Sequence, residues 1–169
     1  MPNIAVLLTC FNRKDKTIAC LESLLLTVKN YNYIANDKAN ISIFLTDDAS
    51  TDGTAQAAMK VCQGEDIHIV QGNGNLFWAG GMRAAWDEAL KHEQTWDFFL
   101  LLNDDTTLHA NAMAELMDTH SCNIYNPEKK SCYFVAVISL DDGREIYRSD
   151  LIAPGKAIYS MTLSEPLED

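Results

Sequence analysis

Four short apolar segments, each followed by a polar loop and then an amphipathic stretch, are the feature that most constrains the fold. A continuous apolar run of this length is typical of a strand that is covered on both faces. Strands that alternate with helices predict an α/β fold, with a mostly parallel central sheet between helical layers. The expected strands are Ile4–Thr9, Ile41–Thr46, a segment within residues 65–72, and Trp96–Leu102.

The stretches between these strands place apolar residues at helical spacing, which predicts a helix after each strand. Residues 31–40 are expected to be a polar connection, and residues 73–81 (NGNLFWAGG) a loop before the third helix. The residues expected on the inner helix faces are Ile18, Leu21, Leu25, Val28, Ala55, Ala58, Met59, Cys62, Met82, Ala85, Trp86, Ala89, Leu90, Met113, Leu116 and Met117.

The length and patterning of the chain predict a single domain. A chain of 169 residues is long enough to bury one hydrophobic core. We expect that core to occupy about residues 3–120. After Cys122 the alternation weakens, and residues 121–169 are expected to form a mixed β extension.

The charge of the chain limits its partners. It carries 24 acidic and 13 basic residues, which gives a formal net charge of −11 at pH 7. An acidic protein repels a phosphate backbone, so we expect no nucleic-acid partner. The same charge disfavours adsorption on an anionic membrane. Local donors or a metal ion could still hold one phosphorylated small molecule.

Cysteine usage and hydropathy bear on location. The five cysteines form no CxxC pair and the four histidines show no zinc-binding spacing, so we expect reduced, mostly buried cysteines. The longest apolar runs are about five residues, against the roughly 20 that a transmembrane helix needs. The N-terminal residues do not resemble a signal peptide. We expect a cytoplasmic protein without a transmembrane segment, either free or peripheral at the inner face of the membrane.

Every chemically rich segment of the sequence follows a predicted strand. Because ligands of open parallel sheets bind outside the carboxyl ends of the strands, these segments are expected to meet at one ligand-binding edge. They are Thr9–Arg13 after the first strand, Asp47–Gly53 after the second, Gly72–Gly74 with Gly80–Gly81 after the third, and Asn103–Asp105 after the fourth.

Several of these residues also have a purely structural interpretation. Asp47 and Asp48 could cap a helix, although capping explains one such acid better than an adjacent pair. Gly80 and Gly81 could mark the end of a loop, or could expose backbone N–H groups to a ligand at a helix start. The pattern is neither GxGxxG nor a P-loop, which argues against a dinucleotide or P-loop site.

Asp104 and Asp105 stand directly after the fourth strand. Two adjacent carboxylates repel each other unless something positive lies beside them. Mg²⁺ or Mn²⁺ would serve, since these ions take one or two carboxylates together with substrate phosphates and water. The alternative is that one acid caps the next helix and the other faces solvent.

Four segments in register resemble the family 2 glycosyltransferases, whose nucleotide-sugar-binding domain has the GT-A fold. "VLLTCFNR" resembles their first-strand signature, and "FLTDDASTDGT" is close to their DD-S-DGT block. "NLFWAGGMRAA" resembles the glycine-rich block of the rhamnosyl- and galactofuranosyltransferase-like branch, and "LLLNDDTTL" stands at the DxD metal motif. The resemblance covers residues 3–120 and implies a Rossmann-like three-layer sandwich.

The resemblance implies a role for each residue that matches a motif. Thr9, Asn12 and Arg13 would line the nucleotide pocket. Asp48 would face the base or ribose, with Asp47 beside it.

The remaining motif residues are implied to lie near the sugar and the diphosphate. Gly80, Gly81 and Arg83 would lie near the nucleotide and the donor sugar. Arg83 replaces the usual Asn, and would either contact the diphosphate or pair with a neighbouring acid.

The Asn-Asp-Asp sequence is implied to bind the metal and part of the donor. Asp105 would hold Mg²⁺ or Mn²⁺, with Asn103 acting through water. Asp104 occupies the variable middle position and is grouped with the nucleotide-sugar-binding residues. We expect Asp105 to matter more for the metal than Asp104.

The implied reaction is inverting glycosyl transfer from a UDP- or dTDP-sugar to a glycan or lipid-linked saccharide, as in polysaccharide biosynthesis. An acceptor hydroxyl attacks the anomeric carbon and needs a general base. No acid of this chain stands in a recognisable base motif, so the base is left unassigned. Family members continue past this point, so we expect the donor-binding N-terminal part of a longer enzyme.

Two other functions compete with this interpretation. The chain could be a non-catalytic module that binds a nucleotide sugar, alone or with a partner that supplies the acceptor site. A nucleotidyltransferase of similar architecture is less favoured because no glycine-rich loop follows the first strand. The apolar cluster Leu76, Phe77 and Trp78 could be a sugar platform, an interface or a lid.

Overall fold

Strands and helices alternate along the chain, as the apolar pattern predicts. The computed structural model describes residues 1–121, and residues 1–113 form its first compact unit. Apart from Ser121, the predicted β extension of residues 121–169 lies outside the described residues. The elements are β1 (Asn3–Cys10), α1 (Lys14–Ile34), β2 (Asn40–Asp47), α2 (Thr54–Val61), β3 (Ile67–Gln71), α3 (Phe77–Ala89), β4 (Phe98–Leu101) and α4 (Ala112–Ser121).

The strands form one parallel sheet in the order β3-β2-β1-β4. β1 pairs with β2 along its whole length, from Asn3 opposite Asn40 to Cys10 opposite Asp47. Both strands are apolar and buried almost throughout, which suits strands inside a covered sheet. The predicted α/β class with a parallel sheet is therefore confirmed.

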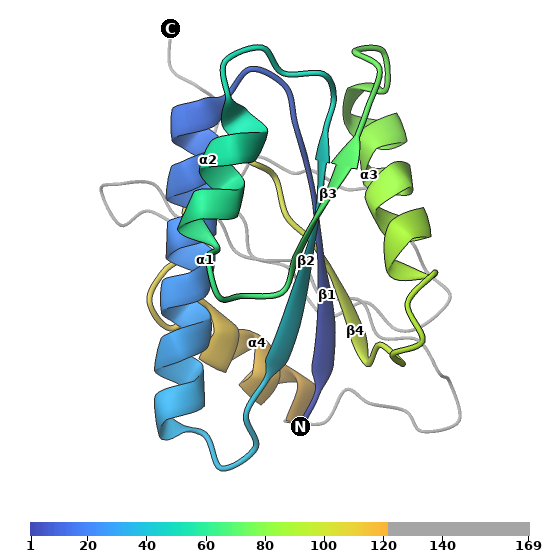
Figure 1. Ribbon diagram of the computed structural model, residues 1–169. Coiled ribbons are helices and arrows are strands. Elements are labelled where there is room, and N and C mark those ends of the chain that lie inside the picture. Colours follow the sequence, from blue (N-terminus) through green and yellow to red (C-terminus); the bar gives the residue numbers. More distant parts are fainter. Residues whose placement is uncertain (122–169) are drawn as a thin grey trace, which may run out of the picture. The chain divides into compact units, whose positions relative to one another are not determined.

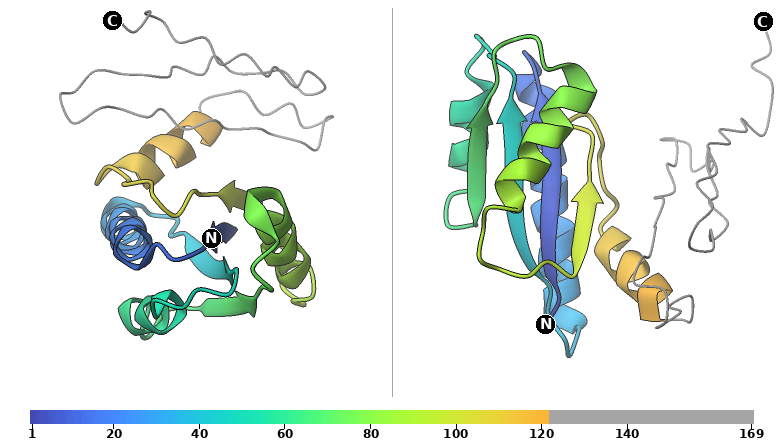
Figure 2. Two further views of the ribbon diagram at one scale, coloured as in Figure 1. Left: turned by 90° about the horizontal axis from the view of Figure 1, so that it is seen from above. Right: turned by 90° about the vertical axis from the view of Figure 1, so that its right-hand side faces the viewer.

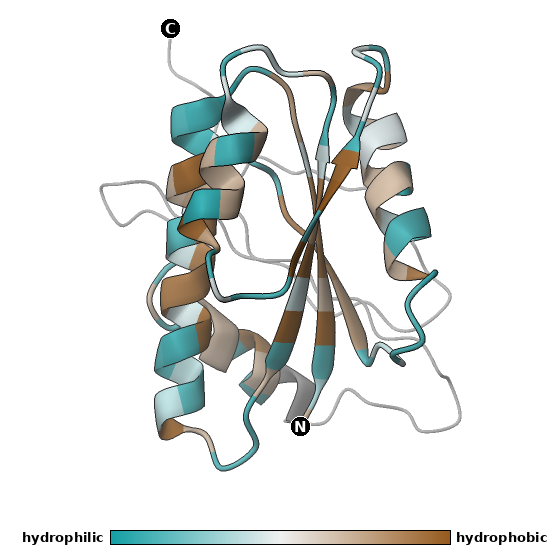
Figure 3. Ribbon diagram, in the orientation of Figure 1, coloured by the Kyte–Doolittle hydropathy of each residue, from teal (hydrophilic) through white to brown (hydrophobic). Residues whose placement is uncertain are grey.

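Helices cover both faces of this sheet. α1 and α2 lie side by side on one face, and α3 lies on the other (Figures 1 and 2). The inner face of α3 consists of Met82, Ala85 and Ala89, which pack with the buried side chains of β1 and β2, including Phe44. Figure 3 shows that the brown, apolar residues run along the strands while polar residues gather in the loops beyond them. The core is thus the predicted three-layer arrangement.

The strand order fixes where a ligand can enter. The chain passes from β1 to β2 and β3 on one side, and then crosses to β4 on the other side of β1. The carboxyl ends of β1 and β4 are therefore neighbours at the point where the strand order reverses, and open α/β sheets bind ligands at such a switch point. Arg13 follows β1 and Asp104 follows β4, so both stand at this switch point.

The structure corrects the predicted start of the third helix. Residues 77–81 are not loop, because α3 begins at Phe77 and both glycines lie inside it. The reason is a distant cap: the Asp48 carboxylate accepts hydrogen bonds from the N–H groups of Leu76 and Phe77. Two smaller differences are that α1 continues through Ile34, and that β4 is shorter than predicted.

Candidate functional site

Asp48 is buried at the end of β2 and anchors the next loop. Its Oδ1 accepts a hydrogen bond from the Gly74 N–H at 2.7 Å. Its Oδ2 accepts from the Leu76 N–H at 2.9 Å and from the Phe77 N–H at 3.3 Å. A carboxylate is well suited to this task because it is acceptor-only and carries charge toward a helix N-terminus. One oxygen thus holds the loop before α3, and the other holds the start of the helix.

The loops after β1 and β2 are joined by side chains. The Asn12 N–H donates to Ser50 Oγ at 2.9 Å, and Asn12 Oδ1 accepts from the Thr51 N–H at 2.8 Å. Asp52 Oδ2 accepts from the Lys14 N–H at 3.0 Å. Asn12 has a φ of 51°, a conformation that asparagine tolerates better than most residues. Both neighbours of Arg13 are therefore fixed.

Asp47 is buried beside Asp48 but has fewer partners. Its Oδ1 accepts from the Ser50 N–H at 3.0 Å, and the Cys10 thiol lies 3.9 Å from the same oxygen. This bond closes the first turn after β2. The two adjacent acids hold different loops, Asp47 its own and Asp48 the loop before α3.

The two glycines of α3 have different surroundings. Gly81 is buried against β1, and a Cβ there would lie 2.6 Å from the Cβ of Thr9, closer than real side chains approach. Its carbonyl accepts a hydrogen bond from Thr46 Oγ1 at 2.8 Å. At Gly80 a Cβ would meet nothing nearer than Leu76 Cβ at 3.2 Å. The lack of a side chain at Gly81 therefore permits the close contact between α3 and β1, whereas this contact does not depend on Gly80.

Arg13 brings together the loops after β1 and β4. Its Nη1 lies 2.9 Å from Asp105 Oδ2 and 3.4 Å from Asp104 Oδ1. The Asp104 side chain is only 9% exposed, against 38% for Asp105 and 49% for Arg13. Asp104 also lies 3.5 Å from the Thr17 hydroxyl, one helical turn after Arg13. Arg13 is thus the positive charge beside the two acids.

Burial shifts the pKa of the Asp104 carboxyl. Its removal from water raises the pKa, the Arg13 guanidinium acts in the opposite direction, and the neighbouring Asp105 raises it further. The Thr17 hydroxyl favours the charged form. Thr17 was not among the predicted site residues, although its helical spacing of four from Arg13 was a usable signal.

Asn103 is engaged by an aromatic side chain from α3. The Trp78 indole Nε1 donates to Asn103 Oδ1 at 2.9 Å, and the Asn103 carbonyl accepts from the Cys20 thiol at 3.2 Å. The Trp78 side chain nevertheless stays 55% exposed, and Phe77 is 79% exposed with a φ of 53°. Trp78 therefore ties the start of α3 to the loop after β4, a role that residue type alone does not reveal.

The other predicted residues lie around this edge. Thr9 is buried beneath Gly81, at the end of β1. Arg83 is exposed on α3 and forms no ion pair or hydrogen bond within residues 1–121. The structure therefore brings Arg13, Asp104 and Asp105 into contact, and it leaves Arg83 apart from them.

The residues at this edge fit a divalent cation held mainly by a ligand. Within residues 1–121 no three acidic, histidine or cysteine side chains form a metal cluster. Mg²⁺ and Mn²⁺ sites often use one or two carboxylates and complete their shell with phosphates and water. The half-exposed Asp105 could supply such a carboxylate, and Asn103 less readily because its side-chain oxygen already accepts from Trp78.

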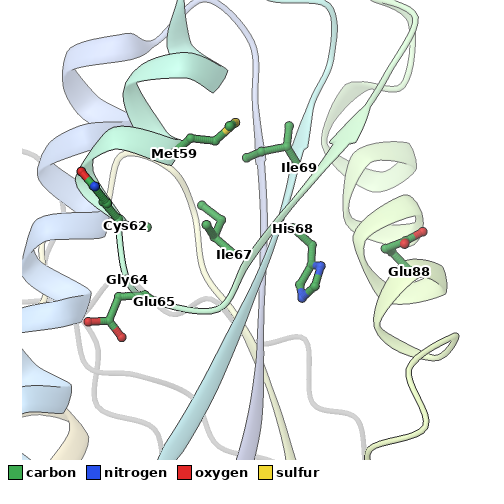
Figure 4. Close-up of a pocket in the computed structure, with 9 residues that line it drawn as sticks. Met59, Cys62, Gly64, Glu65, Ile67, His68, Ile69 and Glu88 are labelled. Atoms are coloured by element: carbon green, nitrogen blue, oxygen red, sulfur yellow. The ribbon is translucent and has the colours of Figure 1, made fainter.

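A cavity of about 510 Å³ lies elsewhere, along the free edge of β3 (Figure 4). Met59 and Ile69 lie on the α2 side of the strand, and His68 and Glu88 lie toward α3. None of the predicted site residues lines it. The volume is therefore a groove at the sheet edge, apart from the polar residues at the switch point.

The buried cysteines give a first prediction. Burial raises the pKa of Cys10 and Cys20 to about 12 and that of Cys62 to about 11. Because the thiolate is the reactive form, we expect iodoacetamide at pH 8 to leave all three unmodified in the folded protein, and to modify them in 8 M urea. Mass spectrometry of tryptic peptides measures this. Rapid labelling of Cys20 before unfolding would contradict its placement under the Asn103 carbonyl.

The sheet order, the helices on both faces and the charged switch point define an α/β protein of the Rossmann-like class. Its sequence matches the family described as glycosyl transferase family 2 over residues 5–145. The match covers most of the chain, so the protein belongs to glycosyl transferase family 2, as the motifs predict. No curated protein matches the sequence significantly.

Two solved structures show similarity at 20% identity and a TM-score of 0.48. One is the mannosyltransferase PcManGT from Pyrobaculum calidifontis, described in complex with GDP-Man and Mn²⁺, and the similarity covers 66% of this chain and 31% of that one. The other is TarS of S. aureus, with 72% of this chain and 20% of that one. The chain thus spans less than a third of either.

Within residues 1–121, no helix is both long enough and apolar enough to cross a membrane.

Proposed function

We propose that this chain is the donor-binding part of an inverting glycosyltransferase. It would take a sugar from a UDP- or dTDP-sugar and serve transfer to a glycan or lipid-linked saccharide, in the cytoplasm or at the inner face of a membrane. The observation that carries the proposal is the meeting of Arg13, Asp104 and Asp105 at the switch point of a family 2 domain. A cation and two acids there suit a metal-bound diphosphate.

The role proposed for each residue follows from whether its side chain is exposed or already holds a loop. Arg13 and Asp105 are half-exposed and could turn toward a diphosphate and its metal. Asp48 and Asn12 already hold loops with their side-chain oxygens, so they would shape the nucleotide pocket. Arg83 is exposed on α3, beyond Gly80 and Gly81, and would approach the donor from that side.

Glycosyl transfer needs stabilisation of the leaving group, orientation of the donor and a general base for the acceptor. A divalent ion, when bound, would offset the negative charge that develops on the departing nucleoside diphosphate. Asp105 would supply a carboxylate to hold that ion, and Arg13 would add a planar cation suited to phosphate oxygens. The general base for the acceptor hydroxyl stays unassigned, because no acid of this chain stands in a recognisable base motif.

A metal-binding experiment tests the proposal. We expect Asp105→Ala to weaken Mn²⁺-dependent binding of UDP, GDP or dTDP by at least about tenfold, since it removes the exposed carboxylate. Asp104→Ala is expected to change binding by about threefold at most, because its side chain is buried under Arg13. Isothermal titration with and without Mn²⁺ measures both.

The same titration separates the alternatives. If none of the three nucleotides binds the wild type and Asp105→Ala leaves stability unchanged, the proposal of a donor site at this edge is refuted. If nucleotides bind and sugar transfer or hydrolysis also occurs, the chain is not a non-catalytic binding module. That second function has the same pocket and differs only in turnover.

A further inference from the structure

We propose that Arg13 is an internal counter-ion that competes with a divalent cation for Asp105, and that it releases Asp105 fully only when a diphosphate arrives with the metal. The inference rests on the proposed function and adds a rule for how metal and nucleotide bind. Its basis is one contact: Arg13 Nη1 already lies 2.9 Å from Asp105 Oδ2, one of the two carboxylate oxygens through which Asp105 could bind a metal.

Arg13 forms one ion pair with a buried acid and one with an exposed acid, and only the exposed pair can change partners. Asp104 is 9% exposed and also contacts the Thr17 hydroxyl, so it keeps its place. The contact between Arg13 and Asp105 joins side chains that are 49% and 38% exposed. Such solvent-exposed ion pairs are weak and are easily replaced by a stronger partner. A cation can therefore take Asp105 from Arg13 without unpacking the core.

The backbone around Arg13 does not have to move. The Asn12 N–H is bonded to Ser50 Oγ, and the Lys14 N–H is bonded to Asp52 Oδ2. Both neighbours of Arg13 are thus held to the loop after β2. The exchange is a rotation of one long side chain about a fixed backbone.

The exchange has an electrostatic consequence for metal binding. A metal on Asp105 without any anion would leave the Arg13 guanidinium close to a second positive charge, which is unfavourable. A diphosphate removes this conflict, because its oxygens accept from the guanidinium and bind the metal together. Metal and nucleotide should therefore bind with positive coupling, and each should raise the affinity for the other by the same factor.

Removing the guanidinium tests this directly. Free Mn²⁺ is measured by electron paramagnetic resonance as it is titrated into wild type and Arg13→Met, without nucleotide. We expect Arg13→Met to bind Mn²⁺ about fivefold more tightly, which is the effect of deleting one competing exposed ion pair. With saturating UDP, GDP or dTDP, whichever binds, we expect this gain to disappear.

Two further variants make the result specific. Lys16→Met removes another exposed positive charge, three residues further on in the first turn of α1, and it should leave Mn²⁺ binding within about twofold of wild type. Asp105→Ala combined with Arg13→Met should abolish the gain. Circular dichroism checks that each variant is folded.

The outcomes separate this inference from the proposed function. A gain below twofold at Arg13→Met, or an equal gain at Lys16→Met, overturns the counter-ion role. A gain that persists with saturating nucleotide also overturns it. Failure of every nucleotide to bind the wild type overturns the proposed function instead, and the Mn²⁺ comparison without nucleotide then decides the role of Arg13.

Discussion

Asp48→Asn is expected to destabilise the protein by about 3 kcal/mol, because it places a donor group against backbone donors. The Asp48 carboxylate accepts from Gly74, Leu76 and Phe77 through both of its oxygens, and it is 5% exposed. Asparagine offers one oxygen, so its NH₂ group must face at least one N–H. Urea unfolding at pH 7 measures the loss.

The adjacent acid provides a matched control. Asp47 is similarly buried, but among residues 1–121 the only backbone N–H that its side chain accepts is that of Ser50. An Asn side chain can keep that bond with its oxygen, so Asp47→Asn is expected to cost about 1 kcal/mol or less. Hydrogen exchange should also show faster exchange at the Gly74 or the Leu76 amide in Asp48→Asn alone. Equal costs for the two variants would mean that Asp48 does not anchor α3.

The pair Asp47 and Asp48 shows how far sequence reasoning reaches here. Their position after a buried strand placed them correctly at the carboxyl edge of the sheet, because the carboxyl ends of parallel strands share one edge. The sequence also allowed a capping role, but only for the nearby helix. Asp52 fills that local role, since it accepts from the Thr54 N–H, whereas Asp48 caps a helix 28 residues further on.

The same limit applies to the acids after β4. Their repulsion predicted a positive partner, and a metal was the expected one. In the structure that partner is Arg13, which lies 92 positions from Asp105 along the chain. Residue type and spacing indicate what a side chain needs, but the fold decides which distant group supplies it. Trp78 at the start of α3 and Asn103 in the loop after β4 illustrate the same point.

The second large loss of stability is expected at one of the two adjacent glycines of α3. We expect Gly81→Ala to destabilise the protein by about 3 kcal/mol, since its Cβ would lie 2.6 Å from Thr9 Cβ. Thr9 belongs to β1, inside the sheet, and is buried, so it has little room to move. The backbone of Gly81 is not left-handed, so the cost is steric. Thermal and urea unfolding measure it.

Gly80→Ala is the natural control, because it adds the same methyl group one residue away. There the new Cβ meets only the Leu76 side chain, at 3.2 Å, and alanine favours a helix over glycine by about 1 kcal/mol. The two effects nearly cancel, so Gly80→Ala should stay within about 1 kcal/mol of wild type. Adjacent glycines with such different costs would show that Gly81 serves the packing of α3 on β1. Equal costs would instead show that α3 does not approach β1 as closely as the structure has it, and Gly81 could then face a ligand through its backbone.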